Sequence, residues 1–179
     1  MINKKRIILF FIFMGLFSAS YQIGAMSLVS EDDAAEFLEE FNNIIGGIDG
    51  FGIFIHNLII ALPMFIPGFG IVWGLFSGGS TGFAFASIVT SIPALASFPP
   101  LAILYFSPFG IMELVAYSLG ISRSYMMIYA VLKNKSIKPQ LLVTGIEIGI
   151  VIALLLVGAY IEFVMIDASK PMIPNIEDL

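Results

Sequence analysis

Apolar residues form long runs along the chain, and polar residues gather in the segments between the runs. The first run, Ile7 to Met26, has no charged residue and about 20 residues, the length of a helix that crosses the hydrocarbon core of a bilayer. The basic residues before it and Ser18-Ala-Ser within it would also suit a secretory signal. We favour a retained helix, because the apolar stretch is longer than a signal core requires.

A polar segment at about 30–49 follows the first run. Ser30-Glu-Asp-Asp is typical of a helix start, with a capping serine and acidic residues in the first turn. Apolar residues then recur at helical spacing, namely Phe37, Phe41, Ile44, Ile45 and Ile48. The pattern predicts an amphipathic helix on the outer membrane face. Its acidic side is either a solvated surface over the bundle end or a docking surface for a partner or a cation.

The long apolar region after this helix is interrupted mainly by proline and glycine. Its length predicts crossings at roughly 51–74, 79–98 and 101–132, of which the last is broken at Ser107–Gly110. Backbone broken at membrane depth needs protein or a water-filled cavity around it, so we expect this break to be buried. A final crossing at 139–166 brings the predicted total to about five.

The predicted fold class is therefore all-α: a polytopic transmembrane helix bundle with broken helices, in a single integral membrane domain over 1–179. Composition agrees, since 59% of the residues are hydrophobic and 12% are charged, against roughly 45–50% and 25% in soluble domains. Cysteine is absent, which excludes disulfides and thiol catalysis. There is no nucleophile elbow, phosphate loop, zinc motif or basic nucleic-acid stripe. We therefore expect no enzyme activity, no cofactor and no nucleic-acid partner.

The formal net charge of −5 is unevenly distributed. Basic residues precede the first run and occupy the loop Lys133–Lys138, whereas acidic residues gather at Glu31–Asp49 and in the tail, 167–179. Lysine and arginine are enriched in cytoplasmic loops of membrane proteins. The pattern predicts a multi-pass protein of the cell membrane with a cytoplasmic N-terminus. The acidic segment and the C-terminal tail would then lie outside.

Four polar side chains inside the apolar region are candidate site residues: His56, Asn57, Glu113 and Glu147. An ionisable side chain is costly there and seldom faces lipid. The two glutamates could form an ion or proton relay, or could bind a metal with His56, although a single histidine argues against a metal site. Alternatively, each glutamate is protonated or hydrogen-bonded to Asn57, His56, Tyr117 or freed backbone. A site for a lipid or peptide headgroup is a further alternative.

Two other polar residues of the apolar region have simpler interpretations. Arg123 lies near the expected cytoplasmic end of its helix, where snorkelling would explain it, and Trp73 fits an interfacial anchor.

The two glutamates are expected to lie at different depths. At about 1.5 Å per residue, Glu113 lies roughly 30 Å from the basic loop and Glu147 roughly 14 Å from it. A direct pair of the two glutamates is therefore disfavoured. Glu147 needs a partner from another helix or another chain.

The motifs Ile-Phe-Ile-His-Asn and Ser-Pro-Phe-Gly-Ile-Met-Glu lie in the stretch from Phe54 to Leu119. This stretch resembles the stage II sporulation protein M family, whose members carry an asparagine in the second crossing and Pro-His-Gly-x-x-Glu in a later one. The matching residues are Asn57, Pro108, Gly110 and Glu113. Phe109 stands where the family usually has histidine, which weakens any activity carried by that motif.

The resemblance implies a function without catalysis. The family is widespread in bacteria and archaea, and its namesake members are membrane components of a cell-wall remodelling machine without a demonstrated catalytic activity. It therefore implies an integral membrane scaffold or subunit of a larger complex, with the bilayer and either other membrane proteins or further copies as partners. Two other functions stay open. One is a small transporter or ion-coupled permease that uses Glu113 and Glu147, and the other is an accessory subunit of a multi-subunit membrane enzyme.

Overall fold

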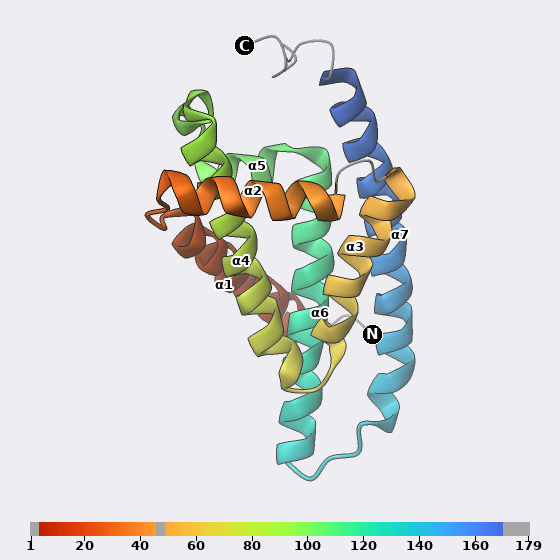
Figure 1. The fold of residues 1–179 in the computed structure, drawn as a ribbon. Coiled ribbons are helices and arrows are strands. Elements are labelled where there is room, and N and C mark those ends of the chain that lie inside the picture. Colours follow the sequence, from red (N-terminus) through yellow and green to blue (C-terminus); the bar gives the residue numbers. More distant parts are fainter. Residues whose placement is uncertain (1–3, 46–48, 170–179) are drawn as a thin grey trace.

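The computed structural model describes residues 4–45 and 49–169, and the side chains of these residues except 41–45 and 169. This part of the chain is all-α, as predicted, and forms a helical bundle (Figure 1). Its elements are α1 (Lys4–Ala25), α2 (Glu31–Ile45), α3 (Gly50–Ala61), the 3-10 helix η1 (Leu62–Phe65), α4 (Phe69–Ser91), the 3-10 helix η2 (Pro93–Ser97), α5 (Pro100–Phe106), α6 (Pro108–Leu132) and α7 (Lys138–Ser169).

Three helices within the described residues are long and apolar enough to cross a membrane. They are α1, α4 and the part of α7 at Lys138–Ala168. The pair α5–α6 passes the same test as a unit, but α5 is bent by 87° from α6, which makes the pair a broken span or a re-entrant loop. The helix Gly50–Phe65 is apolar but shorter. The structure is consistent with a multi-pass membrane protein of three to four candidate spans, and the predicted five crossings are not confirmed.

The first of the predicted middle crossings, 51–74, ends earlier than the sequence suggested. Ile66 is extended, as expected for the residue before a proline, and Gly68 has φ +79°, so the chain reverses there. Helix α4 then begins at Phe69. The glycines at 78–82, where the predicted crossing 79–98 would begin, lie inside α4.

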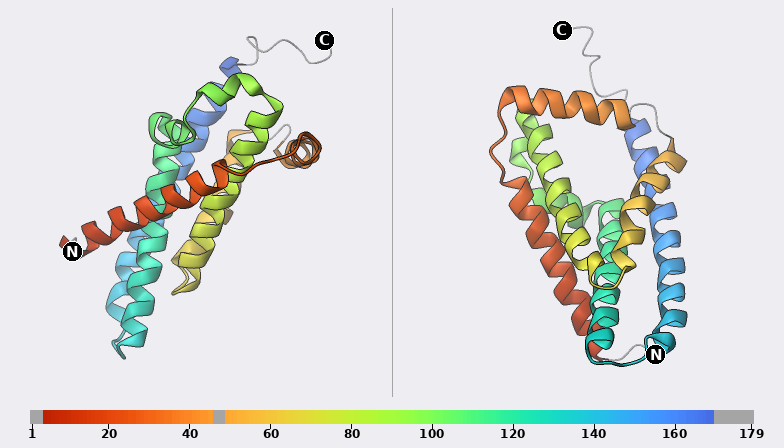
Figure 2. Two further views of the ribbon diagram at one scale, coloured as in Figure 1. Left: turned by 90° about the vertical axis from the view of Figure 1, so that its left-hand side faces the viewer. Right: turned by 60° about the horizontal axis from the view of Figure 1, so that its bottom comes forward.

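Those glycines bring α4 into backbone contact with α1. A Cβ atom on Gly82 would lie 2.0 Å from the carbonyl oxygen of Tyr21, and one on Gly24 would lie 2.0 Å from that of Gly79. Small residues at such spacing allow close helix approach in membrane proteins. Helix α1 therefore packs tightly on α4 and runs obliquely to α6 and α7, as Figure 2 shows.

The predicted acidic helix is present as α2 and lies across one end of the bundle (Figure 1). Ser30 caps it, since its Oγ accepts a hydrogen bond from the Asp33 amide at 3.2 Å. Phe37 packs edge-on against Phe83 of α4, with ring centroids 5.8 Å apart. The side chains of the remaining predicted apolar positions, Phe41, Ile44, Ile45 and Ile48, lie outside the described set.

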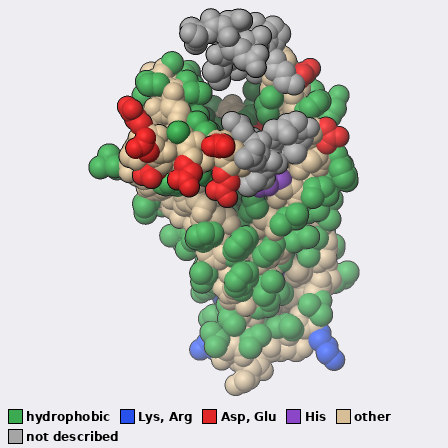
Figure 3. All heavy atoms as spheres, viewed as in Figure 1, with side chains coloured by type: hydrophobic (Ala, Val, Ile, Leu, Met, Phe, Trp, Pro, Cys, Tyr) green, Lys and Arg blue, Asp and Glu red, His purple; other side chains and the backbone are tan. Residues whose placement is uncertain are grey.

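Charge is separated between the two ends of the bundle. Acidic side chains gather around α2, and lysine or arginine side chains appear at the opposite end (Figure 3). The acidic residues of α2 with exposed side chains are Glu31, Asp32, Asp33, Glu36, Glu39 and Glu40. The connection between α6 and α7, with Lys133 and Lys135, is also exposed. Helix α7 reaches Ser169, so most of the predicted acidic tail, 170–179, lies outside the described residues.

The break before α6 differs from the expectation that it is buried. Pro108 is exposed and Ser107 half-buried, whereas Gly110 is buried. The break supplies its own hydrogen bonds: Ser107 Oγ accepts from the Gly110 amide at 3.0 Å and donates to the Ile103 carbonyl. Burial by neighbouring helices is unnecessary where a capping side chain satisfies the freed amide.

Candidate functional site

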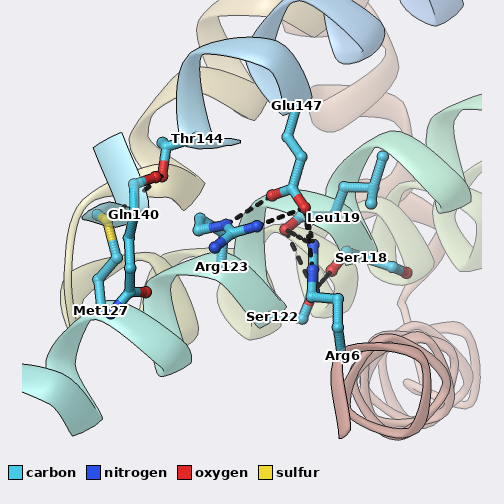
Figure 4. Close-up of polar contacts among 9 residues, drawn as sticks. All are labelled: Arg6, Ser118, Leu119, Ser122, Arg123, Met127, Gln140, Thr144 and Glu147. Atoms are coloured by element: carbon cyan, nitrogen blue, oxygen red, sulfur yellow. Dashed lines mark hydrogen bonds and ion pairs between the residues drawn. The ribbon is translucent and has the colours of Figure 1, made fainter. Parts of the chain in front are cut away.

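Two arginines and one glutamate form a buried cluster between α1, α6 and α7 (Figure 4). Arg123 donates from Nε to Glu147 Oε2 at 2.7 Å and from Nη2 to Oε1 at 2.6 Å. Arg6 donates from Nε to the same Oε1 at 2.9 Å. The exposed fractions are 7% for Arg6, 3% for Arg123 and 8% for Glu147. The carboxylate is thus the shared acceptor that joins three helices.

The helix α6 also holds Arg6 through a stripe of small polar residues. Arg6 Nη1 donates to Ser122 Oγ at 2.5 Å, and Nη2 donates to the Leu119 carbonyl at 3.3 Å. Ser122 in turn donates to the Ser118 carbonyl one turn earlier. A serine that bonds back to its own helix leaves an acceptor lone pair for the arginine. The first turn of α1 is therefore anchored on the middle of α6.

Two guanidinium groups share one carboxylate in this cluster. Two guanidinium groups and one carboxylate give 2 − 1 = +1 within the three side chains. Charge-assisted bidentate bonds between arginine and carboxylate are strong and geometrically specific. Removing the carboxylate would leave two buried cations without this acceptor, a change that costs about 3–5 kcal/mol in proteins.

Two sequence-based interpretations of this region were wrong. Arg123 does not snorkel to an interface, because it is buried against Glu147 on a facing helix. Arg6, which the sequence placed in a basic flank before the first crossing, lies in the first turn of α1 and is buried. The expectation that Glu147 needs a partner from another helix is confirmed. A usable signal was present in α6, where small polar residues at 118, 122 and 124 adjoin Arg123.

The other intramembrane glutamate has a separate set of partners. Asn57 of α3 donates from Nδ2 to Glu113 Oε1 at 2.8 Å, and Tyr117 donates from its hydroxyl to Asn57 Oδ1 at 3.3 Å. This contact matches the alternative, among those from the sequence, in which the Glu113 carboxyl is hydrogen-bonded to Asn57. Glu113 and Glu147 thus bond to different side chains, in agreement with the predicted difference in depth.

The remaining candidate, His56, points out of this arrangement. Its side chain is exposed, whereas the neighbouring Asn57 is buried. Within the described residues, no group of three or more His, Cys, Asp or Glu could hold a metal ion. The predicted helix-break residues Pro108 and Gly110 lie in the first turn of α6, and Glu113 follows in the second.

Glu162 of α7 is a further polar residue, which was not among the candidate site residues predicted from the sequence. Its Oε2 atom is buried without a hydrogen-bond partner in the part of the chain that the structure describes. Trp73, expected as an interfacial anchor, is half-buried and donates to the Ile60 carbonyl at 2.9 Å.

Two hollows lie between the described helices. One, of about 490 Å³, is formed by α1, α2 and α4 near Ser20 and Phe37. The other, of about 400 Å³, lies between α1, α6 and α7, and Arg6 and Glu147 form part of its wall. Glu113 lines neither of them. The arginine–glutamate cluster is therefore a buried charged group with space beside it.

Comparisons with protein-family models, with curated proteins and with solved structures found no match to this chain. The resemblance to the sporulation protein M family accordingly stays a prediction.

Proposed function

We propose that the protein is a non-catalytic integral membrane scaffold, a subunit of a larger membrane protein complex similar to sporulation protein M. One observation carries this proposal: the strongly polar side chains of the apolar helices bond to one another across helices. Glu147 joins α7 to α1 and α6, and Glu113 joins α6 to α3. Such contacts fix helix positions, which is what a rigid subunit needs.

One end of the bundle also presents an acidic surface, on α2. The helix α2 exposes its six acidic residues at one bundle end and packs on α4 through Phe37. A helix held by one face and acidic on the other suits electrostatic docking of a basic partner segment. By the distribution of lysine and arginine, this end would be extracytoplasmic, with the N-terminus and the α6–α7 connection in the cytoplasm.

Extraction from native membranes in a mild detergent tests the proposal. We expect the tagged protein to co-purify with a membrane protein at fixed stoichiometry. Reversing exposed charges on α2, with Glu36→Lys, Glu39→Lys and Glu40→Lys combined, should release that partner. The matched control, Lys135→Glu at the opposite end, should retain it. A chain that runs alone in the mildest extraction would contradict a scaffold role.

A second candidate function is ion-coupled transport. Glu162 favours it, because its buried Oε2 lacks a hydrogen-bond partner in the described residues. Intramembrane carboxylates of this kind serve proton relays in transporters. In proteoliposomes, this function predicts a proton flux that Glu113→Gln abolishes. No flux from the purified chain would remove it, and a stable partner would favour the scaffold or an accessory subunit of a membrane enzyme.

A further inference from the structure

We propose that Lys5 and Lys133 bind the headgroup phosphate of an anionic phospholipid at the basic end of the bundle. The Lys5 ammonium lies 4.8 Å from the centroid of the Tyr129 ring, and the Lys133 ammonium lies 6.0 Å from the same centroid. All three side chains are exposed, at the end of the bundle opposite the acidic helix α2 (Figure 3). This inference concerns a lipid ligand and does not depend on any protein partner.

Helix packing brings the two lysines together from distant parts of the sequence. Lys5 lies in the first turn of α1, and Lys133 directly follows α6, where its amide donates to the Tyr129 carbonyl at 3.2 Å. The Tyr129 ring stacks on Tyr125 with centroids 6.2 Å apart, and Tyr125 packs against the buried Phe13 at 5.5 Å. The ring is therefore held in place, and its attraction for cations fixes where the two ammonium groups meet.

The two ammonium groups have no counter-charge within the part of the chain that the structure describes. The ion pairs there join Glu147 to Arg6 and Arg123, and none involves a lysine. An ammonium over a ring keeps N–H groups that point away from the ring and can donate to an acceptor. Two like charges at one ring repel each other, so an anion that contacts both is favoured. Phosphate oxygen atoms accept such charge-assisted hydrogen bonds.

The surroundings favour a phosphate that belongs to a lipid. Ile8, which shares a helix face with Lys5, is exposed, and so is Leu132, which precedes Lys133. These apolar side chains belong to the apolar surface of α1 and α6, whereas Tyr129 and the lysines are typical of the membrane–water interface. A headgroup phosphate at the lysines would thus have its acyl chains beside apolar side chains. Clustered lysines next to transmembrane helices attract anionic lipids.

Native mass spectrometry of the full chain in detergent tests this site. The probe is an equimolar mixture of phosphatidylglycerol and phosphatidylcholine with the same acyl chains. We expect the chain to retain phosphatidylglycerol at least about 20-fold better than phosphatidylcholine, since each of the two lysines contributes about fivefold. Equal retention of the two lipids, or retention of neither, would overturn the proposal.

Inorganic phosphate distinguishes a lipid from a free anion as the source of the phosphate. We expect phosphatidylglycerol to stay bound in the presence of inorganic phosphate at the same concentration, because the acyl chains add to the affinity of the lipid. Displacement of the lipid by phosphate would overturn its assignment as the ligand.

Two double variants with the same net charge locate the lipid. Lys5→Gln combined with Lys133→Gln removes both ammonium groups from the ring. The control, Lys135→Gln combined with Lys138→Gln, removes two other exposed lysines at the same end of the bundle. We expect the first variant to discriminate less than about threefold between the lipids, and the control to keep at least about half of the original preference. Equal losses would show a diffuse attraction to basic surface and would contradict the site.

Tyr129→Leu tests the ring without changing any charge. It removes the surface over which the two ammonium groups meet, so we expect the preference for phosphatidylglycerol to fall by at least about threefold. Tyr129→Phe is the control, because it keeps the face of the ring and loses only the hydroxyl, and it should retain the preference. The same preference in both variants would contradict the role of Tyr129 in positioning the lysines.

Discussion

Arg123 and Glu147 are joined by two parallel hydrogen bonds, from Nε and Nη2 to the two carboxylate oxygens at 2.7 and 2.6 Å. The pair connects adjacent helices α6 and α7, and Arg6 adds a third bond from α1. Helix α1 packs mainly on α4 and bonds to α6 through Ser122 and the Leu119 carbonyl, so the bond to Glu147 is a polar link from α1 to α7. The stability of the bundle should therefore depend strongly on the carboxylate.

Glu147→Gln should lower the free energy of unfolding by about 3–5 kcal/mol, because it removes the carboxylate that two buried arginines share. Glu113→Gln is the matched control. Glutamine can still accept from the Asn57 amide, so we expect a loss below about 1 kcal/mol. Reversible unfolding in mixed micelles measures both. Similar losses for the two variants would mean that Glu113 is also ionised and paired.

Glycine contacts between α1 and α4 predict a second pair of outcomes. Gly24→Ala would place a Cβ atom 2.0 Å from the Gly79 carbonyl oxygen, and such overpacking costs about 1–3 kcal/mol. Gly15→Ala in the same helix meets nothing within 4 Å and should stabilise by up to about 1 kcal/mol through helix propensity. Melting temperatures in detergent would separate them. Equal shifts would contradict the close approach of these helices.

The cap at the break predicts a local effect. Ser107→Ala removes the acceptor of the Gly110 amide and should cost about 1 kcal/mol. We expect faster hydrogen exchange in the first turn of α6, with the remainder of α6 unchanged. Ser97→Ala, whose exposed hydroxyl caps no α-helix, should leave that exchange rate as it is. An unchanged rate in Ser107→Ala would show that neighbouring packing holds the break.

Labelling of single introduced cysteines tests the proposed orientation of the protein in the membrane, because the chain has no cysteine of its own. Glu36→Cys on α2 should react with a membrane-impermeant maleimide in intact cells. Ser136→Cys, in the basic connection, should react only after permeabilisation. Both positions are exposed, so accessibility in the folded protein does not differ. The reverse labelling pattern would contradict a cytoplasmic N-terminus.

Local signals predicted part of this fold correctly. The apolar run at 7–26 and the Ser30 cap led to α1 and α2, because length and capping act within a few residues. Proline and glycine were less informative. Glycine occurs both in the turn at 66–68 and at 78–82, but only the former segment, which also contains Pro67, reverses the chain. The latter glycines lie against the α1 backbone, and the spacing of small residues does not identify which helix they contact.

The candidate site was predicted only in part, because the contacts of its arginines are also tertiary. Glu147 and Glu113 stood out because a carboxylate in an apolar run is costly. Arg6 was missed because its burial depends on the oblique path of α1, and its partner Glu147 is 141 positions away. Arg123 was misinterpreted because snorkelling and a buried ion pair are equally compatible with a position near a helix end.

The central claim is that Arg123 and Glu147 interact directly and hold the bundle together. A double-mutant cycle with Arg123→Gln, Glu147→Gln and the double variant, measured by reversible unfolding in mixed micelles, tests it most directly. We predict a coupling free energy of about 2–3 kcal/mol, with the double variant more stable than Glu147→Gln alone, since it buries one fewer unpaired cation. Losses that add within about 0.5 kcal/mol would contradict the claim.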